Sequence, residues 1–187
     1  KYTALEDQAF IDQTKTNGNT SRKVVVEDKG ETTASFKVQL SAPTGEDCSF
    51  GLVIDQEALD RYNKDNFTSY KVMDQTGYTL SAKDIKIAKG ESQSALVDIK
   101  VKPFTEEQKK AAVKLALPLK LVSKDGKKEV LASGGSIVYL FDNVVRQPVP
   151  TYNKDNVIKF ELKEDLELTE WSVEYCVNIS DLGTHLG

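Results

Sequence analysis

The stretch Leu115-Ala116-Leu117-Pro118-Leu119-Lys120-Leu121 places a leucine at every second position. Successive side chains of a β-strand point to opposite faces, so this spacing predicts a strand with one face in a hydrophobic core. Pro118 has no N–H to donate to a neighbouring strand. We therefore expect this strand to lie at the edge of a sheet or to carry a bulge at Pro118. Such an edge is a candidate surface for docking another protein.

Six further stretches alternate apolar and polar residues in the same way. Turns that contain glycine separate several of them, as at Asp28-Lys29-Gly30, Ala88-Lys89-Gly90 and Lys124-Asp125-Gly126. Many strands joined by short turns predict an all-β fold, an immunoglobulin-like antiparallel β-sandwich. The apolar positions are Val24 to Val26; Ala34, Phe36, Val38 and Leu40; Cys48, Phe50, Leu52 and Ile54; Ile85 and Ile87; Ala95, Val97, Ile99 and Val101; and Ile137, Tyr139 and Phe141.

Two short helices are expected between the strands. Thr105-Glu106-Glu107-Gln108 has the pattern of a capping box, in which the threonine and the glutamine each satisfy a backbone N–H at the helix start. Asp55 is a favoured N-cap, and the residues from Glu57 toward Tyr62 lose the alternation of a strand.

The alternation stops after Phe141, and Pro148 and Pro150 indicate an extended linker. We expect an immunoglobulin-like β-sandwich over residues 1–142, a linker over 143–150, and the first strands of a truncated second β-sandwich module over 151–187. Those strands are expected around Phe160 and Trp171, where alternation resumes. Two strands are too few for independent stability, so the tail either packs on the first domain or opens a module that continues beyond it.

Charge and hydropathy exclude two classes of partner. The 25 basic and 29 acidic residues are interspersed, with a formal net charge of -4, so we expect no nucleic-acid partner. No apolar run approaches the roughly 20 residues that cross a bilayer. The chain begins at Lys1 without a basic-then-apolar leader, so any export signal is expected to be missing from it already.

Catalytic patterns are missing from the sequence. His185 is the only histidine, which leaves no Ser/His/Asp or Cys/His system within the chain. No zinc spacing or phosphate loop appears, and Ser133-Gly134-Gly135-Ser136 precedes a strand, so it is interpreted as a turn or bulge. We therefore expect no enzyme activity, no cofactor and no metal. A calcium site built from loop Asp and Asn residues stays an open alternative.

The two cysteines are too few for a disulfide framework. Cys48 shares an apolar face with Phe50, so we interpret it as a small buried hydrophobe and not as a reactive thiol. Whether Cys48 and Cys176 are free is left open.

Three aromatic residues, Tyr62, Phe67 and Tyr70, lie in a stretch without alternation. They are the candidate ligand-contact residues, because an exposed ring can stack on a sugar; packing over the end of the sandwich is the alternative. Tyr62 also begins the pentapeptide Tyr-Asn-Lys-Asp-Asn, which occurs at 62–66 and again at 152–156. The flanks of the two copies share no pattern, so we interpret the pair as coincidence and not as an internal repeat.

Several motifs follow one another between about residues 20 and 142: Asp60-Arg61-Tyr62-Asn63, Thr76-Gly77-Tyr78-Thr79-Leu80, Ile87-Ala88-Lys89-Gly90-Glu91-Ser92, and Leu117-Pro118-Leu119 followed by Ser123-Lys124-Asp125-Gly126. In this order they resemble the immunoglobulin-like N-terminal domain of Bacteroidetes surface lipoproteins, the domain of unknown function 1735. The resemblance implies export to the cell surface and outer membrane, with a lipid anchor outside this chain, and it supplies no catalytic residues.

The run from Leu168 to Tyr175, Leu-Thr-Glu-Trp-Ser-Val-Glu-Tyr, resembles an early core strand of a laminin-G or concanavalin-A-like lectin. Together the resemblances imply a non-catalytic cell-surface module that supports glycan binding or adhesion, with a polysaccharide or host glycan as partner. Two alternatives stay open. One is an accessory N-terminal domain of a secreted glycoside hydrolase, and the other is a spacer or protein-docking domain that uses the Pro118 edge.

Overall fold

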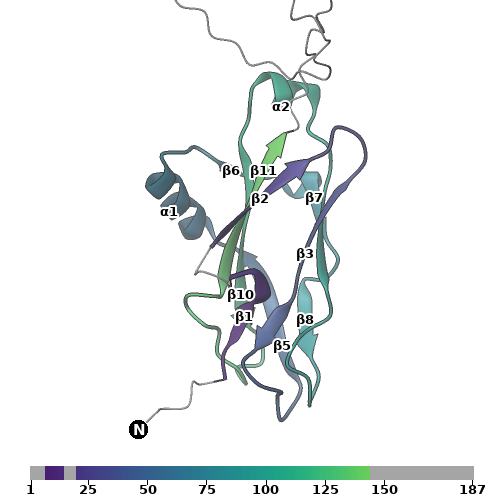
Figure 1. The fold of residues 1–187 in the computed structure, drawn as a ribbon, viewed down its shortest axis with the longest axis vertical. Coiled ribbons are helices and arrows are strands. Elements are labelled where there is room, and N and C mark those ends of the chain that lie inside the picture. Colours follow the sequence, from purple (N-terminus) through teal and green to yellow (C-terminus); the bar gives the residue numbers. More distant parts are fainter. Residues whose placement is uncertain (1–6, 15–19, 144–187) are drawn as a thin grey trace, which may run out of the picture. The chain divides into compact units, whose positions relative to one another are not determined.

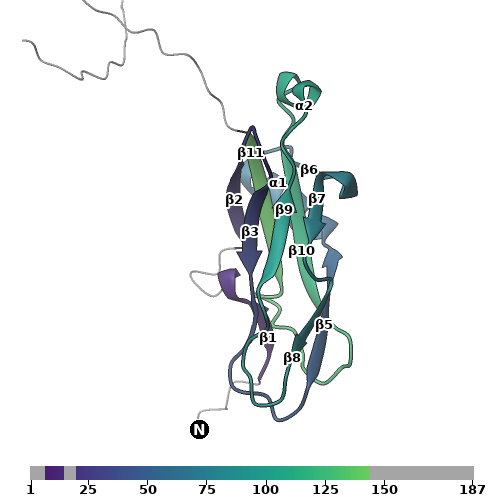
Figure 2. The ribbon, with the colours of Figure 1, turned by 90° about the vertical axis from the view of Figure 1, so that its right-hand side faces the viewer.

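The structure is a computed structural model, and it describes residues 7–14 and 20–143. These residues form an all-β sandwich with two short α-helices, which confirms the expected fold class (Figures 1 and 2). The large sheet has the strand order β2 (Ser21–Val26), β11 (Ser136–Asn143), β10 (Leu115–Ser123), β5 (Cys48–Ile54) and β8 (Asp84–Ile87), and β6 (Lys71–Val72) also pairs with β10.

The second layer contains the smaller sheets. One has the order β3 (Thr32–Phe36), β9 (Val97–Val101) and β7 (Tyr78–Leu80), and the other pairs β1 (Ala9–Ile11) with β4 (Val38–Leu40). Short 3-10 helices lie at η1 (Asp12–Thr14) and η2 (Gln75–Gly77). Alternate residues of each strand fill the space between the layers, among them Phe36, Ile99 and Leu119, whose side chains are fully buried. The period-two pattern therefore identified most of the core correctly. It was wrong at Ile54, which is 43% exposed, and at Ala95, which is exposed and precedes β9.

Pro118 lies in the centre of the large sheet, so the expected edge position is wrong. On one side β10 pairs with β11 along residues 115–120. On the other side it pairs with β6 at Leu115 and Ala116 and with β5 from Leu119 onward. The N–H of Leu121 points toward β11, so by alternation the ring nitrogen of Pro118 faces the gap between β6 and β5. The Pro118 carbonyl faces the same gap and accepts from Asp55 N–H at 3.1 Å.

The stretch from Ala34 to Leu40 is two strands, not the single strand that its alternation predicted. β3 ends at Phe36 and pairs with β9, whereas β4 begins at Val38 and pairs with β1. At Lys37, between them, the N–H donates to the Asp12 carboxylate and the carbonyl accepts from Asp12 N–H. The alternation continues through this break because both strands still face one core.

Both expected helices are confirmed. α2 (Glu106–Lys110) begins with the complete Thr105–Gln108 capping box. α1 (Gln56–Asn66) begins at the Asp55 N-cap and covers the outer face of the large sheet, on the side away from β3 and β7 (Figure 1). Its Leu59 packs with Ala116, Val138 and Leu140 in a second apolar cluster. The β10–β11 pair is therefore buried on both faces.

The expected C-terminal organisation lies outside the described residues. The chain divides into two units, Lys1–Arg146 and Gln147–Gly187, and β11 continues through Asn143. The linker, the second module and the residues Trp171, Cys176 and His185 stay as predicted from the sequence. Cys48 is buried as expected, and its Sγ lies 3.2 Å from Thr44 Oγ1. Within the described residues, no helix is long and apolar enough to cross a membrane.

The Ser133–Ser136 stretch forms the tight turn that precedes β11, as expected. The Gly134 carbonyl accepts from Ile11 N–H at 2.9 Å and from Thr14 Oγ1 at 3.1 Å. A Cβ at Gly134 would lie 2.8 Å from the Cβ of Phe10. Only glycine lets this turn pack so closely against β1.

We predict that Gly134→Ala lowers the free energy of unfolding by about 1–3 kcal/mol, because the added methyl group overlaps an atom close to the backbone. Gly45→Ala is the matched control, since nothing lies within 4 Å of the added Cβ there. Urea unfolding of both variants measures the difference. Equal midpoints would show that β1 moves aside without cost.

Candidate functional site

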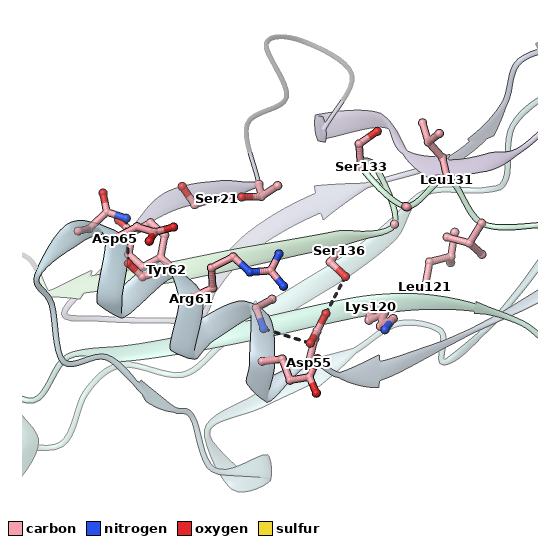
Figure 3. A pocket seen from close by; sticks show the side chains of 17 residues that line it. Ser21, Asp55, Arg61, Tyr62, Asp65, Lys120, Leu121, Leu131, Ser133 and Ser136 are labelled. Carbon is pink, nitrogen blue, oxygen red and sulfur yellow. Dashed lines mark hydrogen bonds between the residues drawn. The ribbon is translucent and has the colours of Figure 1, made fainter.

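A groove lies on the outer face of the large sheet and runs along α1 from its N-cap to its last residue. We name it the α1 groove, and its volume is about 680 Å³. This volume falls in the range of small-ligand sites. Four segments form its walls: α1 with its N-cap, the strand β10, the turn before β11, and the start of β2 (Figure 3). Its lining residues include Asp55, Arg61, Tyr62, Lys120, Ser133 and Ser136.

Asp55 fixes two walls of the groove to each other. Its Oδ1 accepts from Ala58 N–H at 3.1 Å, which caps α1, and its Oδ2 accepts from Ser136 Oγ at 2.7 Å. The helix start and β11 are therefore held together by one carboxylate. Because both of its oxygens already accept hydrogen bonds, Asp55 acts mainly as a structural group.

Arg61 and Lys120 bring positive charge into the groove. Both side chains are exposed, and neither forms an ion pair with another described residue. Figure 3 shows the Arg61 side chain between those of Tyr62 and Ser136. Its planar guanidinium carries several N–H donors in a fixed geometry, so it can bind a ligand oxygen in the groove.

Tyr62 belongs both to the groove and to the packing beneath α1. Its ring is half-buried and meets the ring of Tyr70 edge-on, with 6.1 Å between the centroids. The hydroxyl makes no hydrogen bond with a described residue. A ring that is held in place while it lines an open groove presents a rigid apolar surface to a ligand.

The other two aromatic candidates have different surroundings. Tyr70 is only 8% exposed, and its hydroxyl donates to Asp142 Oδ1 at 3.2 Å, so its ring packs beneath α1. Phe67 is 97% exposed and follows directly after the groove residue Asn66. Contact with a ligand stays a prediction for all three, and only Tyr62 lines the groove.

Asn63 holds the turn that displays Phe67. Its Oδ1 accepts from Thr68 Oγ1 and from Tyr70 N–H, its Nδ2 donates to Tyr70 O, and its own carbonyl accepts from Thr68 N–H, all at 2.9 Å. These bonds hold Phe67 at a φ of 52°, a left-handed conformation that favours glycine. The first copy of the repeated pentapeptide thus supplies this lock and also three groove residues, Tyr62, Asp65 and Asn66.

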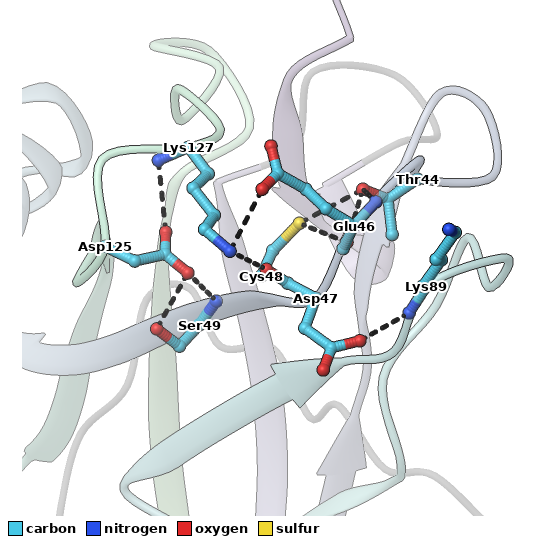
Figure 4. Close-up of polar contacts among 8 residues, drawn as sticks. All are labelled: Thr44, Glu46, Asp47, Cys48, Ser49, Lys89, Asp125 and Lys127. Atoms are coloured by element: carbon cyan, nitrogen blue, oxygen red, sulfur yellow. Dashed lines mark hydrogen bonds and ion pairs between the residues drawn. The ribbon is translucent and has the colours of Figure 1, made fainter.

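A second hollow, of about 370 Å³, lies near the β5–β8 edge. Its polar groups are largely paired with one another (Figure 4). Asp125 accepts from the N–H and the hydroxyl of Ser49, and hydrogen bonds led by the one from Lys127 N–H lower the pKa of its carboxyl. Lys127 pairs with Glu46 at 3.1 Å. Because these bonds join the loop after β10 to β5 and to the loop before it, we interpret this cluster as structural.

Residues 7–14 and 20–143 contain no group of three or more His, Cys, Asp or Glu side chains that could hold a metal ion. Sequence reasoning found Tyr62 and the Asp55 cap, but it missed Arg61, Lys120 and Ser136 as groove residues. Their meeting depends on the pairing of distant strands, which no local pattern encodes.

The chain belongs to a family of N-terminal domains. The matching family model carries the description "-like, N-terminal domain" and covers residues 5–128, which is more than half of the chain. No curated protein matches the chain.

Several solved structures have the same fold. A candidate carbohydrate-binding protein from Bacteroides ovatus matches with a TM-score of 0.57 and 16% identity, over 72% of this chain and 36% of that chain. A protein of unknown function from Bacteroides ovatus matches with a TM-score of 0.57 and 20% identity, over 73% and 45%. EndoBT-3987 from Bacteroides thetaiotamicron, solved with a Man5GlcNAc product, matches with a TM-score of 0.51 and 17% identity, over 65% and 28%. The chain thus spans less than half the length of these proteins, and identities this low show a shared fold alone.

We predict that Asn63→Ala lowers the free energy of unfolding by about 2–4 kcal/mol, because several buried or half-buried hydrogen bonds are lost together. Asn66→Ala is the matched control, since Asn66 makes a single side-chain bond, to Tyr62 O. Thermal unfolding of both variants measures the difference. A loss for Asn63→Ala no larger than for the control would mean that the turn does not depend on this side chain.

The buried phenol of Tyr70 is expected to lower the free energy of unfolding when it ionises at alkaline pH. Burial, assisted by the Asp142 carboxylate, raises the pKa of Tyr70 to about 12. A tyrosine in the unfolded chain titrates near pH 10, so the stabilising effect of the neutral phenol is complete below about pH 10 and is lost as the pH rises toward 12. We expect Tyr70→Phe to unfold more easily at pH 7, by about 1 kcal/mol, and to lose less stability above about pH 10.

Urea unfolding between neutral and alkaline pH tests this expectation, with Tyr62→Phe as the control. Part of the alkaline loss will persist in both variants, because burial also raises the pKa of Tyr139. Identical alkaline slopes in Tyr70→Phe and the unchanged protein would contradict the assignment.

Proposed function

We propose that this chain is a non-catalytic module of an exported cell-surface protein, and that it supports binding of a polysaccharide or host glycan through the α1 groove. The observation that carries the proposal is the half-buried ring of Tyr62 beside unpaired polar side chains in an open groove of about 680 Å³. A fixed aromatic surface bordered by hydrogen-bonding groups suits a sugar, whose rings have apolar faces and polar edges.

Phe67 adds a second aromatic ring beyond the end of the groove. Its exposure leaves both ring faces available, while the Asn63 bonds fix the turn that carries it. A non-glycine residue with a left-handed backbone costs folding free energy, and such residues persist where the surroundings impose them. This exposed ring contributes nothing to the core, which favours a role in recognition.

The relatives support a glycan partner at the level of the whole protein. One neighbour is a candidate carbohydrate-binding protein, and another was solved with a Man5GlcNAc product. In both cases the matched region is a minor part of the other chain. Export, surface location and lipid anchoring are proposed from the family resemblance of the motifs between residues 20 and 142.

A second candidate function is an accessory N-terminal domain of a secreted glycoside hydrolase, which the similarity to EndoBT-3987 favours. This domain would be non-catalytic there as well, because the motifs that carry the family resemblance supply no catalytic residues. The docking alternative has lost its basis at Pro118, because β10 is paired on both sides.

A glycan array probed with the whole chain, followed by calorimetry on the strongest hit, tests the proposal. We expect Tyr62→Ala to weaken binding about 5-fold to 60-fold, which corresponds to about 1–2.5 kcal/mol of lost ring contact. Phe67→Gly is expected to weaken binding without lowering stability, because glycine relaxes the left-handed turn.

Leu96→Ala is the matched control, since Leu96 is an exposed apolar residue that does not line the groove. Binding to no glycan, or binding that both aromatic variants leave unchanged, would refute the proposal.

A further inference from the structure

We infer that the α1 groove selects a neutral, hydroxyl-rich saccharide unit over an acidic or amine-bearing one. This inference rests on the proposed function and adds the class of ligand to it. This selectivity follows from the charges that line the groove and from the hydrogen bonds that its side chains leave open.

Charges of both signs line the groove without pairing with each other. Arg61 and Lys120 are the cations, and Asp55, Glu57 and Asp65 are the carboxylates. No ion pair joins any two of these five residues. Four of the five are exposed, so a ligand in the groove can contact them directly, and because both signs are present no field of one sign dominates the groove.

A ligand with a net negative charge meets carboxylates in the groove, and one with a net positive charge meets cations. A carboxylate or sulfate on the sugar could pair with Arg61, but it would enter a groove lined by three carboxylates. An ammonium group could pair with Glu57 or Asp65, but it would face the two cations. Like charges brought close together oppose binding, so the lining discriminates against both classes.

Hydroxyl groups fit this lining because each one both donates and accepts. Arg61 and Lys120 offer only donors, whereas Glu57 and Asp65 offer only acceptors. Ser136 uses its proton on Asp55, so its oxygen is left to accept from the ligand. The hydroxyl groups of a neutral sugar can serve both kinds of partner while an apolar face of the ring lies on Tyr62.

The experiment compares neutral and acidic glycans on one array and then measures the strongest hit by calorimetry at about 50 mM and about 500 mM NaCl. We expect a neutral hit whose Kd changes by less than about twofold with salt, since no net charge is paired. We expect Arg61→Gln to weaken binding about 3-fold to 10-fold, the effect of one or two hydrogen bonds.

Lys64→Gln is the matched control, because Lys64 is an exposed cation on the same helix that does not line the groove. A strongest hit that carries uronate, sialate or sulfate, weakens at high salt and depends on Arg61 would overturn the neutral class while leaving the proposed function intact. A neutral hit that Arg61→Gln and Tyr62→Ala both leave unchanged, or no hit at all, would overturn the groove as the binding site, and the inference with it.

Discussion

Burial of the β10–β11 pair on both faces is the constraint on which the other features of this structure depend. The inner face supplies leucine, isoleucine and aromatic side chains to the sandwich core, and the outer face needs a cover of its own. α1 provides that cover through Leu59. Its N-cap residue, Asp55, donates its N–H to the Pro118 carbonyl, in the gap between β5 and β6. The α1 groove forms where this cover stops and Lys120 becomes exposed. Fold and candidate site therefore have the same physical origin.

The sequence predicted what depends on neighbouring residues. Alternation identified β5, β8, β9, β10 and β11, and the caps at Asp55 and Thr105 identified both helices, because period and capping act over a few residues. The prediction from the sequence failed where contacts between distant segments determine the structure. The Lys37 break depends on Asp12, and the central position of Pro118 depends on how β5, β6 and β11 share β10. The groove was missed for the same reason, since its walls come from four separate segments.

The pentapeptide at 62–66 has a structural role although its second occurrence in the chain is interpreted as coincidence. As a repeat it has no support, because the flanks of its two copies differ. In its first copy, Asn63 fixes the turn after α1, and Tyr62, Asp65 and Asn66 line the groove. This short segment thus forms the end of α1, supplies part of the groove wall and fixes the turn that exposes Phe67. A ligand held there would contact a part of the molecule that the sandwich core does not require.

The placement of α1 also bears on how this fold can be altered. β5 stops pairing with β10 at Ile54, and β6 begins to pair with the same edge of β10 at Lys71. The residues between them form α1 and its connections and pair with no strand. An engineer could lengthen, shorten or exchange that segment without changing the register of any strand, provided that an apolar side chain still covered Ala116, Val138 and Leu140. The domain is in this sense a scaffold with one exchangeable segment, inserted beside Pro118, which has no N–H to donate and whose carbonyl bonds to the first residue after β5.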